Sequence, residues 1–178
     1  MTYLITCSKS KIIPSIFNPS SLNKLSYNDL LHETREELLT LTNIQLDWNY
    51  TLPAWQLYSG KQSRMYSVIN KDCWENNEVN FKILSALFGW ICKDDLVPNY
   101  NLQMTDKLNN NITVHNFWKS KNVLNKLVFQ TDINLLSTNY LKAFKLSDRK
   151  NGTKPNQKFK GRGAQQGIWL NSQILNSI

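Results

Sequence analysis

The chain opens with Tyr3-Leu4-Ile5-Thr6-Cys7-Ser8-Lys9, where an apolar run of strand-forming residues passes directly into a polar string. Aromatic and β-branched side chains favour strands, and a short continuous apolar run is typical of a strand buried on both faces. In open α/β sheets, ligands bind at the carboxyl ends of such strands. The stretch therefore predicts a buried first strand over residues 3–6, followed by a functional loop that contains Ser8 and Lys9.

Later segments alternate between strand-like runs and stretches with helical spacing. Residues 81–86 and 132–137 are predicted strands, and Phe88-Gly89-Trp90 is a predicted turn. Helices are predicted over about 26–41 with Ser26 as the N-cap, and over 62–70, 116–129, 140–144 and 165–175. This alternation predicts an α/β fold, with residues 1–178 forming a single domain whose mixed or parallel central sheet is flanked by helices.

The composition excludes several classes of protein. With 41% hydrophobic and 11% aromatic residues, the chain of 178 residues is neither disordered nor collagen-like. The longest apolar stretch, residues 83–92, is far shorter than the ~20 residues of a membrane helix. The charges of the first residues follow the apolar ones, which is not the order of a secretory signal, and Cys7, Cys73 and Cys92 lack C-x-x-C spacing. We therefore expect a cytoplasmic protein without disulfides, membrane segment, metal or cofactor.

Positive charge is concentrated near the carboxyl end of the chain. The sequence holds 21 Lys and Arg against 13 Asp and Glu, a net charge of +8. Residues 142–162 contain eight of these cations and only one acid, Asp148. Such a concentrated field predicts a polyanion, DNA, as the partner, although a solvated lysine-rich loop would have the same composition. The predicted DNA-binding residues are Lys142, Lys150, Lys154, Lys158, Lys160 and Arg162.

Three polar residues next to apolar runs are candidate catalytic groups. Asp95 follows an apolar run, where a carboxylate can activate water or stabilise a cationic sugar, but an aspartate in a turn fits equally well. Lys9 at the end of the first strand can bind a phosphate or a base carbonyl. Asn134, inside an apolar strand, can read a base edge or can serve the backbone alone.

Three aromatic residues are candidates for a base pocket. Tyr58, Phe88 and Tyr100, together with Ser8, can hold a base that has left the stack, although each aromatic residue is also a natural core residue.

A series of short motifs follows the same order as in a known family. They are Leu4-Ile5-Thr6-Cys7-Ser8-Lys9, Tyr58-Ser59-Gly60, the run from Ile83 to Gly89, Asp95-Leu96 with Tyr100, Leu102 and Met104, Phe117-Trp118, the run from Ile133 to Tyr140 with Lys142, and Lys160-Gly161-Arg162-Gly163. Together they resemble the YaaA peroxide-stress family and related small domains that open with Cys-Ser-Lys-Ser-Lys. The chain departs from the family pattern at Cys92, in place of an arginine, and at Gln103, in place of a glutamate.

The resemblance implies a DNA-associated α/β protein that protects DNA from oxidative damage, with Lys9 and Asp95 on family positions. The small α/β domain, the basic stretch and the polar strand ends with Lys9, Asp95 and Asn134, without metal or cofactor motifs, favour a DNA glycosylase that hydrolyses the N-glycosidic bond of a damaged or modified base, in repair or in defence against phage with modified cytosines. The alternatives are a non-enzymatic DNA-binding protein of peroxide stress and a basic RNA-associated protein.

Overall fold

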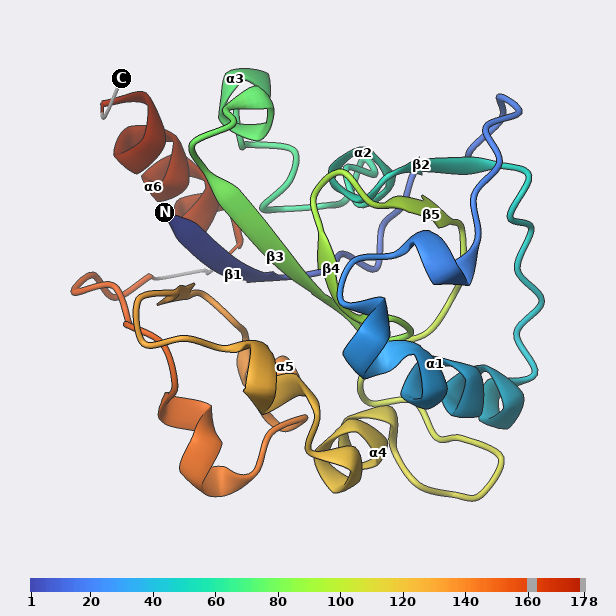
Figure 1. The fold of residues 1–178 in the computed structure, drawn as a ribbon. Coiled ribbons are helices and arrows are strands. Elements are labelled where there is room, and N and C mark those ends of the chain that lie inside the picture. Colours follow the sequence, from blue (N-terminus) through green and yellow to red (C-terminus); the bar gives the residue numbers. More distant parts are fainter. Residues whose placement is uncertain (160–162, 177–178) are drawn as a thin grey trace.

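A mixed four-stranded sheet organises the computed structural model, which describes residues 1–159 and 163–176 (Figure 1). Its strands are β1 (Thr2–Thr6), β3 (Asn80–Ser85), β4 (Gly89–Cys92) and β6 (Ile133–Asn134), in the order β4-β3-β1-β6. The central strand β1 pairs in parallel with β3 and β6, whereas β4 is antiparallel to β3. The predicted α/β class is confirmed.

The remaining elements surround this sheet. A two-stranded antiparallel sheet consists of β2 (Thr51–Pro53) and β5 (Leu96–Pro98). In Figure 1, α3 and α6 lie on one side of the main sheet, and α4 and α5 lie on the other. The helices are α1 (Asn28–Thr42), α2 (Ala54–Leu57), α3 (Lys71–Glu75), α4 (Val114–Lys121), α5 (Thr138–Leu141) and α6 (Gly163–Leu175), with short 3-10 turns η1 (Leu22–Lys24), η2 (Leu124–Leu127) and η3 (Leu146–Lys150).

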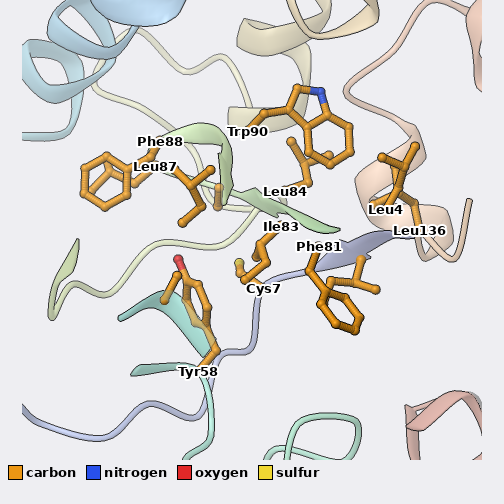
Figure 2. Close-up of a cluster of buried hydrophobic side chains, with 14 of the residues drawn as sticks. Leu4, Cys7, Tyr58, Phe81, Ile83, Leu84, Leu87, Phe88, Trp90 and Leu136 are labelled. Carbon is orange, nitrogen blue, oxygen red and sulfur yellow. The ribbon is translucent and has the colours of Figure 1, made fainter. Parts of the chain in front are cut away.

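Both faces of the sheet are buried, as the continuous apolar runs predict. On the α3 and α6 side, Tyr3 stacks on Phe81 with ring centroids 5.6 Å apart, and Phe81 packs on Trp74 at 4.5 Å. On the other face lie Leu84 and Trp90, whose Nε1 donates to the carbonyl oxygen of Leu124 at 3.0 Å. Figure 2 shows Phe81 on one side of the strands and Leu84 and Trp90 on the other. Because successive side chains of β1 and β3 point to opposite faces, their continuous apolar runs contribute to the hydrophobic core on both sides of the sheet.

Several predicted elements differ from the structure in extent. The predicted helix 62–70 is a series of turns, in which the hydroxyl and the backbone N–H of Ser67 both donate to the carbonyl oxygen of Ser63. The predicted helix 116–129 ends at Asn122, which is left-handed at φ 54°, and continues only as η2. Ser26 does not cap α1, because its hydroxyl donates to Asp95 instead. The predicted strand 132–137 is reduced to the two residues of β6.

The two edges of the sheet are occupied. Along β4, the buried guanidinium of Arg35 donates to the carbonyl oxygens of Phe88 and Trp90, both at 2.8 Å. Along β6, Thr153 bridges in parallel to Ile133, and its carbonyl oxygen accepts the backbone N–H of Asn134 at 2.8 Å. At these positions the outward-facing backbone groups of both edge strands therefore have hydrogen-bond partners.

None of the helices in the described ranges has the length and apolar character that a membrane crossing needs.

Candidate functional site at the carboxyl edge of the sheet

A hollow of about 510 Å³ opens where β1 ends. Its wall combines the loop after β1, the turn segment 62–66 and two residues of α6. A smaller hollow of about 170 Å³ adjoins it and shares Cys7, Ser8 and Lys9. The larger hollow is lined by Thr6, Cys7, Ser8, Lys9, Ser10, Gln62, Ser63, Arg64, Met65, Tyr66, Ser137, Gly163 and Gln166. The loop after β1 thus borders a cavity at the carboxyl edge of the sheet.

Gly60 fixes the loop that forms one side of this hollow. A Cβ atom at Gly60 would lie 2.3 Å from Ser10 Oγ and 2.6 Å from the backbone nitrogen of Lys11. The backbone N–H of Gln62 in turn donates to Ser10 Oγ at 3.1 Å. Only glycine permits this close crossing, so the Tyr58-Ser59-Gly60 motif holds the loop after β1 against the turn segment.

Two glycines fix the opposite wall in the same manner. A Cβ atom at Gly163 would lie 2.7 Å from Arg64 Cβ, and one at Gly167 would lie 2.9 Å from the carbonyl oxygen of Met65. The first turns of α6 therefore pack directly on the backbone of the turn segment. Gln166, between these glycines, reaches the hollow and is only 9% exposed.

A network of hydroxyl groups and a thiol lies beneath the loop. The Cys7 thiol is 2.9 Å from the Tyr140 hydroxyl, and the Tyr100 hydroxyl donates to Cys7 Sγ over 3.9 Å. Tyr100 also shares hydrogen bonds of 2.7 Å with the hydroxyls of Tyr58 and Ser85. Burial raises the pKa of Tyr58, Tyr100 and Tyr140 well above the usual value, so these phenols stay protonated and act as hydrogen-bond donors.

A lysine covers this network from the solvent side. Lys11 Nζ lies 4.4 Å from the centre of the Tyr100 ring and 5.7 Å from that of Tyr58. Burial lowers the pKa of Lys11, because desolvation disfavours the ammonium form, while the neighbouring Cys7 acts in the opposite direction. The site thus holds a desolvated cation next to a thiol and three phenols.

The structure brings some of the predicted residues to this edge and places others beneath it. Ser8 and the exposed Lys9 line both hollows. Tyr58, Phe88 and Tyr100 are buried, and the residues that line the two hollows do not include them. The structure thus places these three residues, predicted for a base pocket, in the hydrophobic core.

Asp95 lies away from the cavity, because β4 is antiparallel. In the register of the sheet, Gly89 is opposite Ser85 at the carboxyl end of β3, and Cys92 is opposite Lys82. Asp95 follows β4 and so lies toward the other end. Its carboxylate accepts hydrogen bonds from Ser26 N–H at 3.0 Å, from Ser26 Oγ at 2.7 Å and from Cys92 N–H at 3.0 Å. The expectation that this strand delivers Asp95 to the ligand edge is corrected by the strand direction.

Both polar atoms of the Asn134 side-chain amide form hydrogen bonds within the protein. Its Nδ2 donates to the carbonyl oxygen of Asn151 at 2.9 Å, and its Oδ1 accepts from the N–H of Leu136 at 3.0 Å. These bonds attach the basic stretch to the sheet edge, whereas Ser137, three residues later, reaches the cavity.

The described part of the basic stretch, residues 142–159, follows α5 and bridges to β6 through Thr153 and Ile133. Lys150, Lys154 and Lys158 are exposed, whereas Lys142 is half-buried. Lys160 and Arg162 lie outside the described residues. The described part of the stretch thus presents three of the predicted cations to solvent.

Comparisons with known proteins agree with these features. The family described as "Peroxide stress protein YaaA" matches residues 16–167. The chain belongs to this family. A UPF0246 protein of Legionella pneumophila (strain Lens) is 31% identical over 115 residues, which cover 57% of this chain and 42% of that protein. A UPF0246 protein of Colwellia psychrerythraea is 34% identical over 97 residues, covering 50% of this chain and 37% of that protein. The matched region is thus less than half of either relative.

Sequence reasoning missed most of the cavity wall. Ser63, Arg64 and Tyr66 lie on a segment predicted as a helix, and Gln166 lies on a helix without a predicted function. The spacing Gly163-x-x-x-Gly167 was the available signal, because two glycines one helical turn apart permit close backbone packing.

In the ranges 1–159 and 163–176, no three His, Cys, Asp or Glu side chains are grouped as metal ligands.

Proposed function

We propose that this protein binds DNA, accepts one extruded nucleotide in the hollow at the end of β1, and hydrolyses the N-glycosidic bond of a damaged or modified base. The observation that carries the proposal is the hollow itself, which provides about 510 Å³ of space at the carboxyl edge of an α/β sheet. Enzymes that act on a base must take it out of the stack, and a pocket of nucleotide size meets that need.

The charges around the hollow suit a polyanion. Lys9 and Arg64 are exposed residues of its wall, and the chain carries a net charge of +8. Cations at the rim can bind the phosphates that flank an extruded nucleotide, while the basic stretch extends the contact along the duplex. Damaged and modified bases are favoured substrates because a weakened base pair costs less to open.

Base release can use the groups that this edge provides. In the proposed reaction the bond between C1′ and the base nitrogen breaks, its electron pair leaves with the base, water adds to C1′, and the proton that this water loses passes to the base nitrogen. Hydroxyl donors such as Tyr140, which lines the smaller hollow, can stabilise charge on the leaving base. Lys9 can hold the neighbouring phosphate in place.

A second candidate is a non-enzymatic DNA-binding protein of peroxide stress. The observation in its favour is that the described residues lining the two hollows include no Asp or Glu. A glycosylase commonly uses a carboxylate to stabilise the cationic sugar. Without one, the hollow can hold a nucleotide and shield it without turnover.

Turnover separates the two candidates. The protein is incubated with duplexes that carry a single oxidised, deaminated or modified base, and with the unmodified duplex, and abasic sites are then cleaved with alkali. Strand cleavage at the modified position supports the glycosylase. Binding of the duplexes without cleavage of any of them supports the second candidate.

The basic stretch provides a test of DNA binding itself. We expect the triple variant Lys150→Gln, Lys154→Gln and Lys158→Gln to reduce the slope of log K against log salt by roughly 0.9 for each lost phosphate contact. The matched control replaces Lys24, Lys107 and Lys126, which are exposed elsewhere on the chain. Equal slopes for both triple variants would show that the basic stretch does not contact DNA phosphates.

A further inference from the structure

Two helices that lie on the same side of the main sheet, α4 and α5, flank the smaller hollow. Asn139 and Tyr140 of α5 line this hollow together with Met104 and Thr105. In the first turn of α4, the backbone N–H of His115 donates to the carbonyl oxygen of Met104 at 2.9 Å. The loop that closes the hollow is therefore in contact with the beginning of α4.

Four basic side chains gather on these elements. His115 and Lys119 are four residues apart in α4 and so share one face of that helix. Lys142 directly follows α5. Arg149 of η3 folds back toward the end of α5, because its Nε donates to the carbonyl oxygen of Phe144 at 3.4 Å. We call His115, Lys119, Lys142 and Arg149 the α4–α5 patch.

The members of the patch influence one another electrostatically. Burial lowers the pKa of His115, and the charges of Lys142, Lys119 and Arg149 lower it further, whereas a hydrogen bond with Asn116 acts in the opposite direction. The three cations therefore lie close enough to the imidazole to disfavour its protonation, and the patch is a region of positive potential.

No acid neutralises the patch within the part of the chain that the structure describes. Its three permanent cations are half-buried, and none of them forms an ion pair with a described residue. Lys121, two residues after Lys119 on α4, is by contrast paired with Glu37. Asp148 accepts a hydrogen bond from the hydroxyl of Ser147 at 3.2 Å. Cations gathered without a counter-ion suit an anionic ligand.

We infer that the α4–α5 patch binds backbone phosphates of DNA and that the strand beside the extruded nucleotide runs across it. Lys9 lies in the walls of both hollows, so cations extend from the larger hollow, past the loop after β1, to the patch. A series of cations matches the series of phosphates along a strand, whereas a single small anion would need only one of them. The inference rests on the proposed function, since DNA supplies the phosphates.

The salt dependence of DNA binding tests these contacts. A labelled duplex with one mismatched base is bound at several salt concentrations, and the dissociation constants are measured by fluorescence anisotropy. We expect the double variant Lys119→Gln with Lys142→Gln to reduce the slope of log K against log salt by roughly 0.9 for each lost phosphate contact. The matched control is Lys24→Gln with Lys126→Gln, at two lysines that are exposed elsewhere, and it should keep the wild-type slope.

The imidazole of His115 provides a second measurement that needs no change to the cations. A phosphate beside the ring favours its protonated form, so wild-type affinity for the duplex should rise by about 3- to 10-fold from about pH 8 to about pH 6. Lysine and arginine do not change charge in this range. His115→Gln should abolish the rise. His32→Gln should retain it, because His32, the other histidine of the chain, lies on α1 beside Glu36.

The outcomes separate this inference from the proposed function. A slope equal to that of the control variant, or a rise in affinity that survives His115→Gln, would overturn the phosphate contacts of the patch while leaving DNA binding in place. Urea denaturation shows whether each variant is folded, and the His115 measurement decides if the double lysine variant is not. Failure of the wild type to bind the duplex would overturn the proposed function itself.

Discussion

Replacing Asp95 tests whether this carboxylate serves the fold or the substrate. It accepts three hydrogen bonds, and Asp95→Ala would leave the backbone N–H groups of Ser26 and Cys92 without their acceptor. Each unpaired donor costs about 1–3 kcal/mol, so we expect a loss of about 2–5 kcal/mol in the free energy of unfolding. Asp95→Asn can keep its oxygen on both N–H groups and donate its amide to Ser26 Oγ. Since only the charge is lost, about 1–2 kcal/mol is expected.

Urea denaturation followed by tryptophan fluorescence measures both variants, and base release is measured on the same preparations. Asp94→Asn is the matched control, because the Asp94 side chain is 69% exposed and its replacement should change stability by less than about 0.5 kcal/mol. A structural Asp95 predicts that Asp95→Asn still releases base at nearly the wild-type rate. Unchanged stability together with a loss of roughly 10²- to 10⁴-fold in base release would refute this reasoning and identify Asp95 as a catalytic group.

Three further predictions concern buried groups. Trp118→Ala should lower the free energy of unfolding, measured by urea denaturation, by about 3–5 kcal/mol, because the indole is fully buried and donates to the carbonyl oxygen of Ala86 at 2.8 Å. A loss below about 1 kcal/mol would contradict its place in the core. Lys82→Met should lower the free energy of unfolding by about 3–5 kcal/mol, because it removes the ammonium that lies 3.1 Å from the buried carboxylate of Asp132. The double variant Lys82→Met with Asp132→Leu should recover much of this stability, because no unpaired charge remains. For Lys11, burial lowers the pKa in the folded state, so between that pKa and the usual 10.5 the unfolded chain binds more protons and stability rises with pH. The stability of the wild type relative to Lys11→Gln should therefore increase from pH 7 to pH 10, and a constant or falling difference would show that Lys11 is not desolvated.

The parts of the fold that were predictable are those with a local cause. The apolar run of β1 and the polar string after it depend on neighbouring residues alone, and the structure places Ser8 and Lys9 at the cavity as expected. The position of Asp95 depends on the direction of β4, which is set by the turn before Gly89 and by pairing with β3. A residue after a strand reaches the ligand edge only if that strand runs parallel to its neighbours.

Gln166 and Ser63 show that a contact between distant segments of the chain is not predictable from the sequence of either segment. They come together because α6 packs on a segment about 100 residues earlier in the chain, and no pattern within either segment describes that contact. Asn134 stands out in the sequence as a polar residue within an apolar segment, but sequence alone does not distinguish a backbone partner from a ligand. The structure gives both of its amide atoms backbone partners.

The way the two sheet edges are closed bears on how this protein behaves in concentrated solution. An open edge strand is a template on which another chain can add by backbone pairing, the first step toward aggregates and fibrils. Here Arg35 blocks one edge with a side chain, and residues near Thr153 block the other with backbone. The second closure belongs to a stretch of lysines that would repel one another when no anion is bound. Conditions that loosen this stretch, such as low ionic strength, should therefore favour growth of assemblies from the β6 edge and not from the β4 edge.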